Sequence, residues 1–165
     1  MGYNTAIEDA VNMGWKLAAV IKRQAPPALL QSYEMERLPI ALRNTGNARR
    51  FADSIGLYRA TPALETDTRA GEAARHRAAE NLGTHARAEF NIPGFTLDAR
   101  YDGSSIIAGD NTPPPPDSPT TYVPTGKPGG RAPHVWLPDG RSLYDSFGFE
   151  WTLPRLGPRP GDPEP

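Results

Sequence analysis

The chain has 165 residues, enough for one ordinary domain, but only 38% of them are hydrophobic. Its 19 prolines and 16 glycines predict long irregular stretches. A net charge of -1 gives no electrostatic basis for binding nucleic acid or an anionic membrane. Because the chain has no cysteine, disulfides, thiolate metal sites and cysteine nucleophiles are excluded.

The start of the chain argues against a targeting segment. It lacks a basic n-region and carries Glu8 and Asp9 where the apolar stretch of a signal peptide would begin. No apolar run approaches the roughly 18 to 20 residues of a membrane span. We therefore expect a soluble cytoplasmic protein with neither a membrane nor a nucleic acid as partner.

The first predicted element is a helix that begins near Thr5. Thr5 and Glu8 form the T-x-x-E pattern of a capping box, and Pro26 and Pro27 end the element. Apolar residues recur at helical spacing and also lie off that stripe, so the helix is apolar on more than one side. Such a helix should pack inside a larger protein. The stripe comprises Ile7, Ala10, Val11, Gly14, Leu17, Ala18 and Ile21, and Met13, Trp15 and Val20 lie off it.

Two further helices are predicted. The second begins near Pro27 and continues to Leu57, with Pro39 expected to kink or break it. Within it, the segment 34–37 is interpreted as a charged helix face. The third helix covers roughly residues 68–90, has few apolar residues, and is interpreted as a solvated surface helix.

After Pro93 the pattern changes. Apolar and polar residues alternate over 95–99, and one apolar pair follows at 106–107, which predicts short strands. A Pro/Gly-rich linker leads to a further predicted strand at 134–137 and a turn at 138–140. The predicted fold class is therefore mainly α with short β segments. The predicted parts are helices over 1–92, short strands and linker over 93–130, the start of a small domain over 131–157, and a disordered tail over 158–165.

The histidines do not form a metal site by spacing. His76, His85 and His134 are scattered along the chain, with no partner at metal-ligand spacing, so we interpret none of them as a ligand. No residue is assigned a catalytic role from the sequence.

Three runs of the chain resemble one family of enzymes. Residues 2–18 resemble the G-x-N-T-x-x-x-D-A-x-N-L-x-W-K-L run of class A FAD-dependent monooxygenases, the para-hydroxybenzoate-hydroxylase-like family. Residues 30–39 resemble that family's L-x-x-Y-x-x-E-R-x-P run. Residues 131–148 resemble the entry to the thioredoxin-like C-terminal domain of its phenol-hydroxylase-type members.

The resemblance implies a fold, cofactors and a site. The fold would be the C-terminal helical part of an FAD-binding, Rossmann-like domain, followed by an incomplete thioredoxin-like start. The cofactors would be FAD and, as electron donor, NAD(P)H, and the substrate a phenolic or other aromatic small molecule. Gly2, Tyr3, Asn4 and Thr5 would bind the pyrimidine end of the flavin, where a helix start stabilises negative charge. Without the resemblance, the same residues would be interpreted as no more than a good N-cap.

Family resemblance also gives roles to three residues nearby. Arg37 is expected to pair structurally rather than act on substrate. Asp9 is interpreted as a dipole and packing residue, and Trp15 as part of a core.

Two signatures of the intact family do not occur in the chain. These are the G-x-G-x-x-G turn that holds the FAD pyrophosphate and the G-D-A-A-H segment. We therefore expect a C-terminal fragment that is inactive alone, the product of a truncated or misassigned open reading frame or a piece of a longer gene. The alternatives are a non-enzymatic helical interaction module derived from such an enzyme, whose partner would be a separately encoded N-terminal half, or a decaying gene product.

Overall fold

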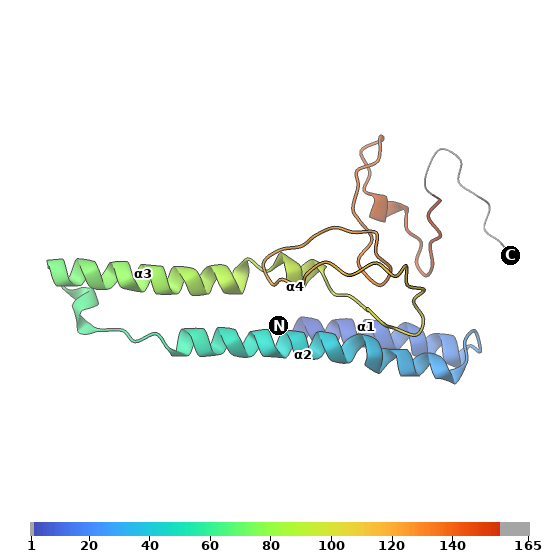
Figure 1. Ribbon diagram of the computed structural model, residues 1–165, viewed down its shortest axis with the longest axis horizontal. Helices are drawn as coiled ribbons and strands as arrows, with labels where there is room; N and C mark the ends of the chain where they lie inside the picture. The colour runs from blue at the N-terminus through green and yellow to red at the C-terminus, as the bar shows by residue number, and fades with distance from the viewer. Residues whose placement is uncertain (1, 156–165) are drawn as a thin grey trace. The chain divides into compact units, whose positions relative to one another are not determined.

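The computed structural model describes residues 2–155. It contains two compact units, Met1–Arg131 and Ala132–Pro165, which are treated separately below. The first unit holds four α-helices: α1 (Gly2–Ile21), α2 (Gln31–Gly56), α3 (Arg69–Phe90) and α4 (Pro93–Leu97) (Figure 1). Single 3-10 turns at Pro27–Leu30 and Pro62–Glu65 precede α2 and α3. The mainly helical fold class is confirmed, but no β-strand occurs among residues 2–155.

Helices α1 and α2 form an antiparallel hairpin (Figure 1). The chain reverses just after α1, where Arg23 adopts a left-handed φ of 59° and the Gln24 N–H donates to the Ala19 carbonyl at 2.8 Å. Such a bond spans the helix end and satisfies a carbonyl that the helix itself leaves unpaired. The two prolines then start the next element instead of continuing α1, as the sequence predicted.

The predicted break at Pro39 is wrong, because α2 runs unbroken from Gln31 to Gly56. Proline removes one backbone hydrogen bond and crowds the preceding turn, which costs several kcal/mol in an unsupported helix. Here both halves of α2 are held by tertiary contacts. Arg37 lies before the proline and Arg43 after it, and each binds carboxylates outside α2. These contacts help to offset the cost of the proline within the helix.

The buried side of α1 is polar. Asn12 and Lys16 are its buried residues, whereas Val11 is 67% exposed and Ile21 77% exposed. The apolar stripe of α1 therefore has little packing against residues 2–155. The hydrophobic effect alone would bury the apolar stripe and expose Asn12 and Lys16. The polar contacts described below decide its orientation within this unit.

Helix α3 is the surface helix that the sequence predicted. The hydroxyl of Thr68 accepts a hydrogen bond from the Gly71 N–H at 3.1 Å and caps the helix start. Only Gly71 and Ala74 are buried along its length. The remaining positions are largely open to solvent, as the low apolar content of this segment indicated.

The strand predicted over 95–99 is wrong. Residues 93–97 form the short helix α4, with Pro93 at its first position and the Phe95 N–H bonded to the Ile92 carbonyl at 3.0 Å. Proline suits a first helical position because no donor is needed there. A strand also needs a neighbouring backbone to complete its ladder, and the described residues offer none to this segment. The pair at 106–107 likewise lies in irregular structure.

Gly94 lies at the closest backbone approach in this unit. A Cβ at this position would lie 1.7 Å from the Ser118 carbonyl oxygen. We expect Gly94→Ala to lower the free energy of unfolding by about 1–3 kcal/mol, because the 118–121 segment would have to move away. Gly109→Ala is the matched control, since a Cβ there meets nothing within 4 Å. Urea unfolding followed by circular dichroism measures both, and equal midpoints would contradict the prediction.

The second unit is built around a tight turn. Gly140 has a φ of 81°, and the Leu137 N–H donates to the Arg141 carbonyl at 2.8 Å. The predicted turn at 138–140 is thus confirmed, but the predicted strand at 134–137 is wrong. It is reduced to one isolated bridge between Trp136 and Ser142, because the 3-10 turn Leu143–Ser146 begins directly afterwards. The tail predicted over 158–165 lies outside the described residues.

Candidate functional site

The sequence-predicted site residues form the first turn of α1. Gly2, Tyr3 and Asn4 are exposed and Thr5 is half-buried. The predicted capping role of Thr5 is wrong, because α1 already includes Gly2. The Thr5 hydroxyl instead accepts a hydrogen bond from Asn44 Nδ2 of α2 at 2.9 Å. Its contact is therefore between helices rather than within one.

This turn has the chemistry of a site for an electron-rich edge. The first N–H groups of a helix have no partner within it and carry partial positive charge. A Cβ on Gly2 would meet nothing within 4 Å, so the approach to the backbone is open. The N–H groups at a helix start suit carbonyl oxygens and delocalised negative charge, which are the features of the pyrimidine end of a flavin.

A buried guanidinium lies behind the first turns of α1. Arg37 is 3% exposed, and it donates to Asp9 at 2.7 Å, to Glu8 at 2.9 Å and to the Tyr101 hydroxyl at 3.2 Å. Burial lowers the pKa of Arg37, but the hydrogen bonds to Asp9, Glu8 and Tyr101 outweigh it and raise that pKa. Arg37 therefore stays charged and ties α1 to α2. The predicted structural pairing of Arg37 is confirmed.

A second buried cluster lies further along the same helices. The Glu36 carboxylate is 2% exposed and accepts from Asn12 at 2.7 Å, Lys16 at 2.6 Å and Ser104 at 2.6 Å. Burial raises the pKa of Glu36, but the hydrogen bonds from Lys16, Ser104 and Asn12 outweigh it, so the pKa lies below its usual value. The interpretation of Glu36 and Arg37 as a charged helix face is wrong, since both are buried between elements.

A third contact fixes the segment that follows α4. Arg43 Nη2 donates to Asp117 at 2.6 Å and to the Gly94 carbonyl at 3.1 Å. The guanidinium also lies over the Phe95 ring, 4.5 Å from its centroid. These contacts hold α4 and the 117–121 segment against α2.

Comparisons with known proteins decide the family. Residues 1–48 match the FAD binding domain family. This range includes the first turn of α1 and those residues of the two buried clusters that lie on α1 and α2. The chain is 35% identical over 164 residues to the phenol 2-monooxygenase of Pseudomonas sp. (strain EST1001), covering 88% of this chain and 27% of that protein. The chain belongs to the class A FAD-dependent monooxygenases.

Solved structures agree with this assignment. The native and K252c-bound structure of RebC-10x matches 88% of the chain with a TM-score of 0.75 and 38% identity, over 27% of RebC-10x. The flavin-dependent monooxygenase PieE, in complex with FAD and substrate, matches 88% with a TM-score of 0.67 and 28% identity, over 28% of PieE. The chain thus spans little more than a quarter of the length of these three relatives.

Several important residues of this monooxygenase segment escaped sequence analysis. Lys16, Ser104 and Asn44 each make a contact that joins separate elements. Lys16 had a signal, since it lies four residues after Asn12 and so shares one helix face with it. Ser104 had none, because its partner Glu36 is 68 positions away.

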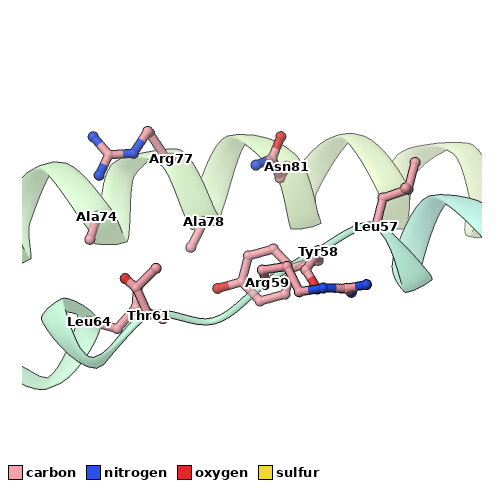
Figure 2. A pocket seen from close by; sticks show the side chains of 9 residues that line it. All are labelled: Leu57, Tyr58, Arg59, Thr61, Leu64, Ala74, Arg77, Ala78 and Asn81. Carbon is pink, nitrogen blue, oxygen red and sulfur yellow. The ribbon is translucent and has the colours of Figure 1, made fainter.

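A small hollow lies between α3 and residues 57–64 (Figure 2). It measures about 160 Å³, with Arg59 and Arg77 among its polar groups. His85 lies further along α3, where it pairs with Glu89 at 2.8 Å. Among residues 2–155 no group of three or more His, Cys, Asp or Glu residues could hold a metal ion. The same residues contain no helix long and apolar enough to cross a membrane.

Proposed function

We propose that the chain is one segment of an FAD-dependent enzyme that hydroxylates aromatic rings. In this proposal Gly2, Tyr3, Asn4 and Thr5 bind the pyrimidine end of the isoalloxazine. The observation that carries the proposal is the first turn of α1, which is exposed, rich in donors and part of the FAD-binding match. Polar contacts from α2 hold this turn in place, as a binding surface with a fixed geometry requires.

The division of labour follows from the residues present. Bound FAD would supply the oxidising chemistry, with NAD(P)H as electron donor and O2 as oxidant. The chain's own part would be to orient the flavin edge through backbone N–H groups and to stabilise negative charge there. Gly2 would allow the closest approach, because it has no side chain to hold the ring away.

The substrate we propose is a phenol or a larger aromatic ring. The phenol 2-monooxygenase among the relatives supports this class. We further propose the domain division given by the sequence, with residues 131–157 as the start of a thioredoxin-like domain. A cytoplasmic location suits a cysteine-free chain, since disulfides are rare in that reducing compartment.

Flavin titration of the purified chain tests the proposal. We expect little quenching of FAD fluorescence by the chain alone, because it lacks the pyrophosphate-binding G-x-G-x-x-G turn. Adding the N-terminal portion of such an enzyme, on a separate chain, should restore tight binding. NAD(P)H-dependent hydroxylation by the chain alone would overturn the inactivity we propose, and no binding in the mixture would overturn the flavin site.

A helical interaction module is the second candidate. The observation that favours it is the exposed apolar stripe of α1, on which Val11 and Ile21 are more than two-thirds solvent-accessible at 67% and 77%. The same titration discriminates between the two. An interaction module would bind the N-terminal portion without producing any hydroxylation when FAD and NAD(P)H are added.

A further inference from the structure

Two side chains of α2 hold Thr5. Asn44 Nδ2 donates to the Thr5 hydroxyl at 2.9 Å, and Arg37 Nη2 donates to the Thr5 carbonyl at 3.4 Å. Arg37 and Asn44 are seven residues apart, which places them on one face of α2, about two turns from each other. The last residue of the proposed flavin-binding turn is thus contacted from α2 at both its backbone and its side chain.

The contact of Asn44 does not serve packing alone. Its Oδ1 atom is buried and accepts no hydrogen bond within the described residues. A buried acceptor left unpaired costs roughly 1–3 kcal/mol, so an apolar residue would pack more favourably at this position. The bond to Thr5 is the interaction that only a polar side chain can make here.

We propose that Asn44 is a positioning residue for the flavin-binding turn. It fixes the start of α1 against α2, so that the N–H groups of this turn stay aimed at the flavin edge. This inference rests on the proposed function above. Arg37 assists through the Thr5 carbonyl, but it also anchors Asp9 and Glu8, so Asn44 is the residue that can be tested separately.

Hydrogen exchange of the full chain without flavin tests the positioning. We expect Asn44→Ala to speed exchange of the 6–9 amides about 5-fold, the effect of one lost hydrogen bond. Thr5→Val removes the other partner and should give the same change, with no further effect in the double variant. Asn47→Ala is the matched control, because Asn47 is buried on the same helix but donates to the Arg43 carbonyl within it.

Flavin binding, measured with the N-terminal portion present, tests the consequence. Asn44→Ala should weaken FAD binding several-fold and make the reduction potential of the flavin more negative, since the positive helix end stabilises the reduced, negatively charged ring less well. Asn44→Gln should restore much of both, because its amide keeps a donor for the Thr5 hydroxyl and adds no charge near the flavin. A purely packing role would not restore the potential in this way.

The outcomes separate the two proposals. Faster exchange together with a shifted potential, both absent in Asn47→Ala, supports positioning by Asn44. Unchanged exchange or an unchanged potential in Asn44→Ala, with wild-type flavin binding intact, overturns the positioning role and leaves the proposed function standing. Absence of flavin binding by the wild-type mixture overturns the proposed function and, with it, the role of Asn44.

Discussion

Glu36→Gln should lower the free energy of unfolding by about 3–5 kcal/mol, the range for breaking one side of a buried ion pair. Lys16 is fully buried and lies 2.6 Å from the Glu36 carboxylate. The substitution keeps the shape of the side chain but removes its negative charge, so the ammonium would remain in the interior without compensation. Urea unfolding at neutral pH, followed by circular dichroism, measures the loss.

Two comparisons show whether the buried charge is the cause. Glu34→Gln changes an exposed carboxylate on the same helix and should cost less than about 0.5 kcal/mol. Replacing the pair together, with Lys16→Met and Glu36→Leu, should recover much of the stability, because neither charge is then buried. Equal midpoints for Glu34→Gln and Glu36→Gln would show that the cluster contributes nothing beyond an exposed charge.

The same variant should change the acid dependence of stability. Because the pKa of Glu36 lies below its usual value of 4.5 in the folded chain, its ionised form stabilises the fold above that value. This contribution is lost as the pH falls through the lowered pKa. Glu36→Gln cannot titrate, so its unfolding free energy should fall less steeply than that of the wild type below about pH 4.5.

Arg37→Met should lower the free energy of unfolding by about 2–4 kcal/mol. The guanidinium is 3% exposed, and its loss would leave Asp9 and Glu8 together with no cation between them. We expect a smaller effect than at Glu36, because Asp9 and Glu8 are 31% and 46% exposed and water can solvate them. The measurement is again urea unfolding at neutral pH.

The control for this variant is an exposed arginine of the same helix. Arg49 is 85% exposed and lies 3.8 Å from Asp53, so Arg49→Met should change stability by less than about 0.5 kcal/mol. The loss of unfolding free energy in Arg37→Lys should lie between those of Arg37→Met and Arg49→Met. An ammonium keeps the charge but lacks the planar guanidinium that reaches several acceptors at once. If Arg37→Met were as stable as Arg49→Met, the buried network would not hold the hairpin.

Much of this protein was determined by local sequence. Helical spacing and the prolines at 26 and 27 predicted the first helices and the turn between them, because these signals act within a few residues of backbone. The run at residues 2–18 also indicated the family, and the FAD-binding match over residues 1–48 agrees with it. The role of that run at the flavin stays a prediction.

Tertiary contacts decided what local sequence could not. The local sequence predicts Thr5 as a helix cap, but in the structure its hydroxyl accepts a hydrogen bond from Asn44, 39 positions away. Alternation over 95–99 reads as a strand, but a strand forms only where another backbone completes its ladder. Glu36 decides which side of α1 is buried, because its carboxylate accepts hydrogen bonds from Asn12 and Lys16. A buried charge needs a partner, and that partner can lie far away in the sequence. Local spacing therefore does not predict which residues pair.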